Sequence, residues 1–262
     1  MENIVKTKLK NGQKTIGGFL QTLSPVAAEI LSQCGFDWLI VDLEHAAGDF
    51  ANLQHQLQAM NGSDVVPFAR APWNDEVAIK RILDTGVMGV LVPYVNTRAE
   101  AEAAVAACKY PPQGVRGVAG SPRAAGYTGN AMPYLQAANA ETIVMVAVET
   151  MEAVRNLDEI LQVEDLDGIF IGPMDLASSM GHLGNPAHPE AQEQIAIIEE
   201  KVIGSGKFLG TVAGTREKAR ECFQKGYQWL VVMQDGATLL TEIGRASCRE
   251  RVLVSGGGGG CV

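Results

Sequence analysis

The stretch TIVMVAV, residues 142–148, is followed directly by Glu149. An apolar run that is rich in valine and shows no alternation of polar positions is typical of a strand buried on both faces of a parallel sheet. An unpaired ionised carboxylate at the end of such a strand would be costly, so Glu149 needs a cation or a proton. This stretch therefore predicts a buried strand that carries a functional group at its carboxyl end.

Seven further, shorter apolar runs recur along the chain, and longer amphipathic segments separate them. The runs are residues 16–20, 38–42, 65–69, 88–92, 168–171, 208–212 and 229–233, and the helix-like segments are 26–33, 52–60, 76–83, 99–108, 151–161 and 191–205. Repeated strand–helix units predict an α/β protein, either a (β/α)8 TIM barrel or an open doubly wound sheet. No Gly-x-Gly-x-x-Gly motif follows the first run, which favours the barrel.

Length and composition narrow the class of protein. The chain has 262 residues, 47% of them hydrophobic, and a single barrel domain commonly takes about 250 residues. Its net charge of -9 argues against a nucleic-acid partner or an anionic membrane surface. No signal-like or membrane-spanning run is present, and Cys34, Cys108 and Cys222 lie in helix-like segments without a CxxC motif. We expect reduced core thiols and a cytoplasmic protein.

The carboxyl-terminal residues do not look natural. The segment EIGRASCRERV, which begins at Glu242, matches one reading-frame translation of a common sequencing-library adapter, and five consecutive glycines follow. We therefore predict one barrel domain over residues 1–241 and a non-native tail over residues 242–262. The eighth barrel helix, expected to begin near Asp235, would then be truncated or replaced.

Two acidic residues follow neighbouring strands and point to a metal site. Glu149 ends the fifth run, and Asp175 comes just after the sixth. Because adjacent strands lie about 4.8 Å apart, residues at their ends can share one ion, and oxygen ligands suit Mg²⁺ or Mn²⁺. Taken singly, Glu149 could instead form a salt bridge or a helix cap, and Asp175 could cap the short helix that begins near Leu176.

A histidine and an arginine follow the second and third runs. His45 could take a proton at neutral pH, and Arg70 could stabilise an oxyanion or hold a carboxylate, although an ion pair with Asp42 is the alternative role for Arg70. His182 and His188, in or near the loop of residues 181–186 after the sixth run, remain ambiguous. The lysines are not well placed for an imine, since Lys80, Lys109 and Lys207 among others are expected in helices or at the opposite face. A metal-dependent route is favoured.

Four segments resemble a known family. Residues 35–46 (GFDWLIVDLEHA), 79–86 (IKRILDTG), 110–117 (YPPQGVRG) and 167–176 (DGIFIGPMDL) resemble, in order, motifs of the HpcH/HpaI family of class II pyruvate-dependent aldolases. The resemblance spans roughly residues 12 to 240. It implies a (β/α)8 barrel with a divalent metal (Mg²⁺, Mn²⁺ or Co²⁺), and dimers that assemble into homo-hexamers with the last helix exchanged between subunits.

The resemblance also implies a role for each site residue. His45 corresponds to the proton acceptor, Asp84 to the acid that raises the basicity of that histidine, and Arg70 to the arginine that stabilises the transition state. Glu149 and Asp175 correspond to the metal ligands, with Asp175 and the backbone of Met174 also contacting the substrate carboxylate. The chain departs from the family at Ala147, where many members carry a substrate-binding glutamine.

The activity implied is reversible cleavage of a 4-hydroxy-2-oxo acid into pyruvate and an aldehyde. A metal chelated by the 2-keto and carboxylate oxygens would stabilise the pyruvate enolate that cleavage leaves behind. Two alternatives stay open. One is an acyl-CoA lyase of the citrate-lyase type, for which the sequence shows no obvious basic patch. The other is a catalytically silent barrel, which would have no need of the polar set at the strand ends.

Overall fold

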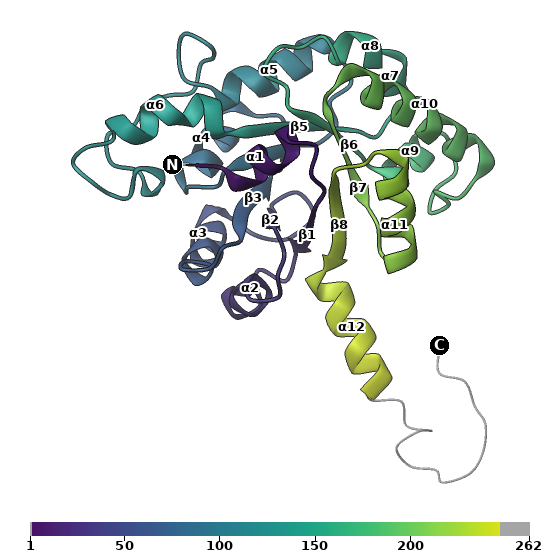
Figure 1. Ribbon diagram of the computed structural model, residues 1–262, viewed down its shortest axis with the longest axis horizontal. Coiled ribbons are helices and arrows are strands. Elements are labelled where there is room, and N and C mark those ends of the chain that lie inside the picture. Colours follow the sequence, from purple (N-terminus) through teal and green to yellow (C-terminus); the bar gives the residue numbers. More distant parts are fainter. Residues whose placement is uncertain (1, 247–262) are drawn as a thin grey trace.

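The computed structural model describes residues 2–246, and in it eight parallel strands close into a barrel (Figure 1). The strands are β1 (Thr15–Leu20), β2 (Trp38–Asp42), β3 (Val66–Arg70), β4 (Gly89–Val92), β5 (Ile143–Val148), β6 (Gly168–Ile171), β7 (Phe208–Val212) and β8 (Trp229–Gln234). Each strand pairs with its neighbour in the sequence, and β8 pairs with β1. The predicted TIM barrel is confirmed, and no strand bound differs from its prediction by more than one residue.

Helices surround the barrel. They are α1 (Ile4–Lys10), α2 (Pro25–Ser32), α3 (Phe50–Ala59), α4 (Glu76–Asp84), α5 (Arg98–Cys108), α6 (Met132–Glu141), α7 (Met151–Arg155), α8 (Leu157–Ile160), α9 (Pro173–Ser179), α10 (Pro189–Ser205), α11 (Arg216–Lys225) and α12 (Asp235–Ala246). The helix predicted over residues 151–161 is broken at Asn156, whose side-chain amide donates to the carbonyl of Asn96. The predictions did not include α1 or α6, and they anticipated α11 only as a helix-like segment around Cys222.

Large aromatic side chains fill the inside of the barrel. Trp38 and Trp229 stack with ring centroids 3.5 Å apart, and Phe68 and Phe170 pack edge-on against Trp229. Room for these rings comes from small residues on neighbouring strands, since a side chain at Gly17 would collide with Trp38. The barrel is therefore a packed core, and its open space lies at the ends of the strands.

Helix α1 closes the amino-terminal end of the barrel. Asn3 caps the helix, and its side-chain amide donates to the carbonyls of Met88 and Glu141. Val5 and Leu9 are fully buried against the aromatic interior. A functional site can therefore form at the opposite end of the barrel, where the strands have their carboxyl ends.

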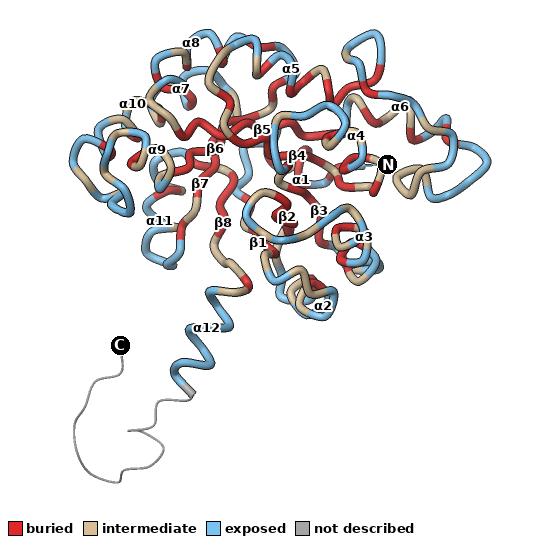
Figure 2. The backbone as a smooth tube through the Cα atoms, turned by 180° about the vertical axis from the view of Figure 1, so that it is seen from behind, coloured by how far each residue is buried: buried red, intermediate tan, exposed pale blue. Residues whose placement is uncertain are grey.

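Helix α12 leaves the barrel at the end of β8. It begins at Asp235, as predicted, and projects away from the body of the molecule with most of its surface exposed (Figure 2). Asp235 is buried and accepts hydrogen bonds from the backbone N–H groups of Gln21 and Thr22, which fixes the start of the helix. Residues 247–262, most of the predicted non-native tail, lie outside the described residues.

The sequence also predicted the state of the cysteines and the lack of a membrane-spanning segment. The three cysteines in the described part of the chain are unpaired, and Cys108 and Cys222 are buried as expected. The expectation for Cys34 was wrong: its thiol is exposed, because the chain has already left α2 at that point. Among residues 2–246, no helix has the length and apolar character needed to cross a membrane.

Candidate active site

A pocket of about 380 Å³ opens at the carboxyl ends of the strands. It is lined by residues near the carboxyl ends of seven of the strands or in the segments that follow them: Phe19, Gln21, His45, Arg70, Glu149, Phe170, Gly172, Pro173, Met174, Asp175, Pro186, Val212 and Gln234. Five of the six predicted site residues are in this set, and they come together because parallel strands all end at one mouth of the barrel. The sixth, Asp84, does not line this pocket.

Asp42 holds Arg70 in place. The Asp42 carboxylate, fully buried at the end of β2, accepts hydrogen bonds from Arg70 Nε and Nη2 at 2.9 and 2.6 Å, and another from Gln21 Nε2 at 2.8 Å. Burial opposes ionisation of Asp42, but the hydrogen bonds and charge of Arg70 outweigh it and lower the pKa of this carboxyl group. The alternative ion pair is therefore present, and it orients the arginine that lines the pocket.

Some N–H groups of the Arg70 guanidinium remain available to donate hydrogen bonds to a ligand. A guanidinium has five N–H groups, and two of those of Arg70 donate to Asp42. Nη1 lies 3.1 Å from Glu44 Oε2 as an ion pair, but that oxygen is buried without an aligned hydrogen bond. The ring of Phe19 packs beneath the guanidinium, 4.6 Å from its central carbon. The pocket thus presents a fixed cation with unused hydrogen-bonding capacity.

Glu149 is buried at the end of β5, as its sequence position predicts. Its Oε1 accepts a hydrogen bond of 2.8 Å from the backbone N–H of Tyr94, which follows β4. A side chain at Gly172 would collide with the Glu149 carboxylate, so glycine at this position lets β6 approach it closely. Burial, together with the charges of Glu44 and Asp175, raises the pKa of Glu149 to about 7. No ion pair to Glu149 occurs among the described residues.

Asp175 lies in the first turn of α9, but it does not cap that helix. The helix begins at Pro173 with Gly172 as its N-cap residue, so the expected start near Leu176 was three residues too late. The Asp175 carboxylate instead accepts a hydrogen bond of 3.4 Å from the Tyr94 hydroxyl. Tyr94 thus links the two acidic residues, because its hydroxyl donates to Asp175 and its backbone N–H donates to Glu149.

The balance of charge in this pocket fits a divalent cation. The Glu44, Glu149 and Asp175 carboxylates act electrostatically on one another, and the charge of Arg70 is already matched by Asp42. Burial raises the pKa of Glu44 as well, and its Oε2 lacks a hydrogen-bond donor. Oxygen donors with an excess of negative charge are the ligands that hard ions such as Mg²⁺ and Mn²⁺ prefer.

His45 stands at the rim of the pocket. Its side chain is 56% exposed, and its Nε2 lies 3.9 Å from Glu44 Oε1. The backbone N–H of His45 donates to Asp42 Oδ1 at 3.3 Å, so the carboxylate that orients Arg70 also shapes this turn. An exposed imidazole beside this group of carboxylates can exchange a proton with a bound molecule or with solvent.

Asp84 and His45 are not in contact within one chain. It ends α4, which runs back towards the amino-terminal end of the barrel, and its Oδ1 accepts a hydrogen bond of 2.7 Å from the buried Arg116. Asp84 lines a separate hollow with Arg81 and Arg123. One chain therefore does not bring Asp84 to His45, and the predicted effect of Asp84 on His45 would need contact with a second copy.

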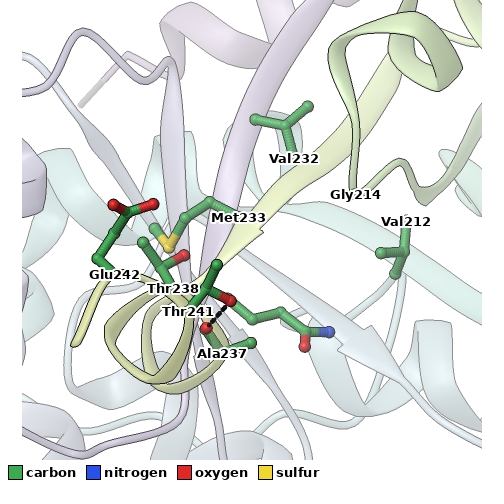
Figure 3. Close-up of a pocket in the computed structure, with 9 residues that line it drawn as sticks. Val212, Gly214, Val232, Met233, Ala237, Thr238, Thr241 and Glu242 are labelled. Carbon is green, nitrogen blue, oxygen red and sulfur yellow. Dashed lines mark hydrogen bonds between the residues drawn. The ribbon is translucent and has the colours of Figure 1, made fainter. Parts of the chain in front are cut away.

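Sequence reasoning left Gln21, Tyr94 and Gln234 without a role. Each ends a strand or follows one within two residues, and that position is the signal that could have identified them. The amides of Gln21 and Gln234 line the pocket, whereas Ala147 contributes a buried methyl group to the barrel interior. Gln234 and Val212 also line a second hollow, between the end of β8 and the first turns of α12 (Figure 3). The two hollows are therefore adjacent.

The fold and the pocket define a TIM-barrel protein with acidic and basic side chains gathered at one mouth of the barrel. The family model described as HpcH/HpaI aldolase/citrate lyase matches residues 15–241. The chain therefore belongs to this family.

Named relatives agree with the family match. The chain is 43% identical over 247 residues to a 4-hydroxy-2-oxo-heptane-1,7-dioate aldolase of Escherichia coli, with 94% of each chain covered. It is 40% identical to a 5-keto-4-deoxy-D-glucarate aldolase of the same species, covering 89% of this chain and 91% of that one. A crystal structure of a family protein from Burkholderia cenocepacia superposes with a TM-score of 0.90 at 34% identity, covering 95% of this chain and 99% of that one.

Proposed function

We propose that this protein is a metal-dependent aldolase that reversibly cleaves a 4-hydroxy-2-oxo acid into pyruvate and an aldehyde. The observation that carries the proposal is the convergence of Glu149 and Asp175 beside Arg70 and His45 in one pocket. Membership of the family and the names of two relatives agree with it. Among the residues that the structure describes, no lysine lines the pocket, which favours a metal route over an imine route.

Glu149 and Asp175 would hold the divalent ion, and the excess of carboxylates around them is the feature of this chain that fits it. When bound, the ion supplies Lewis-acid polarisation of the 2-keto group of the substrate. The remaining N–H groups of Arg70 would stabilise the negative charge that develops on the keto oxygen. Removing one such preorganised donor typically costs about 2.7–4 kcal/mol of transition-state stabilisation.

The pocket also offers groups that would position the substrate. The substrate carboxylate would contact Asp175 and the backbone at Met174, at the start of α9. His45 would accept the proton of the 4-hydroxyl group during cleavage and return it during synthesis. Because the His45 side chain is more than half exposed, this proton can pass on to solvent.

The subunit arrangement is part of the proposal. The chain would act in the cytoplasm as a homo-oligomer built from dimers, in the form of a hexamer. Exposed apolar residues on the projecting α12, Leu239 and Leu240, support an assembly in which a second copy covers this helix. The same assembly could bring Asp84 of one copy to His45 of another.

Pyruvate release from a panel of 4-hydroxy-2-oxo acids tests the activity. The assay is run with added Mg²⁺, Mn²⁺ or Co²⁺ and after exhaustive chelation. We expect pyruvate to appear with at least one acid and only when a divalent ion is present. Full activity after chelation, or trapping of a pyruvate adduct on a lysine by borohydride, would contradict the proposal. Release of CoA from an acyl-CoA ester without any aldol cleavage would favour the acyl-CoA lyase.

A further inference from the structure

Two histidines and a glutamate form a cluster beside the candidate active site, in the connection from α9 to α10. Ligand atoms of His182, His188 and Glu190 all lie within 4.8 Å of one another. His182 Nε2 is 2.8 Å from Glu190 Oε2, and the two imidazole rings stack with centroids 3.5 Å apart. None of the three residues belongs to the site described above.

The backbone around this cluster is well defined. His182 N–H donates to Ala177 O, Asn185 N–H to His182 O, and His188 N–H to Asn185 O. Gly181 and Gly184 have φ values of 84° and 75°, a conformation that glycine adopts without strain, so the chain can turn twice within this short connection. The three side chains are thus brought together by local turns before any ligand binds.

We propose that His182, His188 and Glu190 form a second cation site, selective for borderline transition-metal ions such as Zn²⁺. Imidazole nitrogens suit Zn²⁺, Cu²⁺ and Ni²⁺, whereas carboxylates and water suit Mg²⁺ and Mn²⁺. Two imidazoles, one carboxylate and a water molecule make a common four-coordinate zinc set. The donor set therefore separates this cluster from the oxygen-rich site at Glu149 and Asp175.

Little rearrangement is needed for these three side chains to face one ion, because their ligand atoms already lie within 4.8 Å of one another. The cost of binding is small: the rings must tilt until their nitrogens face one ion. The capping bond from Glu190 N–H to His188 Nδ1, already long at 3.3 Å, would weaken.

The position of the cluster connects it with the candidate active site. Pro186 lies between the two histidines in sequence and lines the pocket that contains His45 and Asp175. An ion that joins His182 to the start of α10 would fix the segment that carries Pro186. The cluster would thus rigidify one wall of the pocket without contributing a group to the chemistry.

Zinc titration of the whole chain tests the site. Accessible thiols, including that of the exposed Cys34, are first alkylated, and excess Mg²⁺ is present to occupy the oxygen-rich site. Calorimetry should then show one Zn²⁺ bound per chain. We expect His182→Gln and His188→Asn each to weaken this binding by at least about tenfold. Asparagine at position 188 keeps a side-chain acceptor for the first turn of α10, which guards against unfolding of that helix.

The matched control is His55→Gln, which removes an exposed histidine of α3 far from the cluster in sequence. Its zinc affinity should equal that of the unaltered protein. Unchanged zinc affinity in both His182→Gln and His188→Asn, with native circular dichroism, would overturn the proposal. So would the absence of any zinc binding by the thiol-blocked, unaltered chain.

Discussion

Asp42 shows how one buried residue organises the candidate site. Its carboxylate accepts hydrogen bonds from Arg70 and Gln21 and from the backbone of the turn that carries His45. A fixed arginine loses less conformational entropy when it binds an anion than a mobile one does. Asp42 is therefore a positioning residue, and its effect on chemistry passes through Arg70.

Replacement of His45 by alanine tests proton transfer. We expect turnover in aldol cleavage to fall by at least about a hundredfold, a typical contribution of a general base. The fold and metal binding should be retained, because the His45 side chain is largely exposed and is not a proposed ligand. The control is His55→Ala, on the exposed face of α3. Equal turnover in His45→Ala and His55→Ala would show that His45 is not the base.

The ionisation of Glu149 predicts how stability depends on pH. Its pKa rises from 4.5 to about 7 on folding, so the folded state loses stability as the pH rises from about 4.5 to about 7, where the unfolded chain has released this proton and the folded state still holds it. With divalent ions removed, Glu149→Gln should raise the free energy of unfolding at pH 8 by on the order of 2 kcal/mol. The gain should shrink as the pH falls towards 5.

Urea unfolding across this pH range measures the effect. The control Glu152→Gln, on the exposed surface of α7, should change stability little at any pH. A gain in Glu149→Gln that is the same at pH 5 and pH 8 would show that ionisation of Glu149 is not its cause.

At the residue scale, the sequence predicted which groups gather in the pocket but not how they are held. Arg70, Glu149 and Asp175 follow strands, and closure of the barrel was enough to bring them together. The link through Tyr94 could not be predicted, because it depends on a backbone N–H group that points at Glu149 from a neighbouring strand. Asp84 lies apart from His45 within one chain, and similarity of sequence alone does not say whether two residues meet within a chain or between copies.

At the scale of elements, the strands were predictable and some helices were not. The strands appear as continuous apolar runs because both of their faces are buried. In α6, by contrast, only Tyr134 and Ala138 are buried, so its sequence carries little of the spacing that marks an amphipathic helix. Helix α1 is short, and contacts with the end of the barrel define it more than its own pattern does.

Helix α1 should contribute strongly to stability. Leu9 is 1% exposed and packs into the interior cluster, so Leu9→Ala should lower the free energy of unfolding by about 2–5 kcal/mol. The matched change Ile4→Ala, at a residue of the same helix that is 40% exposed, should cost well under half as much. Urea denaturation measures both. Equal losses in the two variants would mean that α1 does not close the barrel as described.

At the scale of the whole molecule, the projecting α12 predicts self-association. Leu239 and Leu240 are 51% and 76% exposed on a helix that points away from the barrel. We expect light scattering to give a mass that is a multiple of 27.9 kDa, and Leu240→Glu to shift the protein towards smaller species. Native circular dichroism would confirm that the variant barrel still folds. A monomeric mass for the unaltered chain at all concentrations would contradict the proposed assembly.

The central claim is that Glu149 and Asp175 share one divalent ion beside Arg70 and His45. Crystals grown with Mn²⁺ and pyruvate, measured near the manganese absorption edge, test it most directly. The account predicts an anomalous peak between the two carboxylates, about 2.0–2.3 Å from an oxygen of each, with pyruvate between the ion and Arg70. A manganese peak that contacts neither carboxylate, or no peak in this pocket at saturating Mn²⁺, would contradict it.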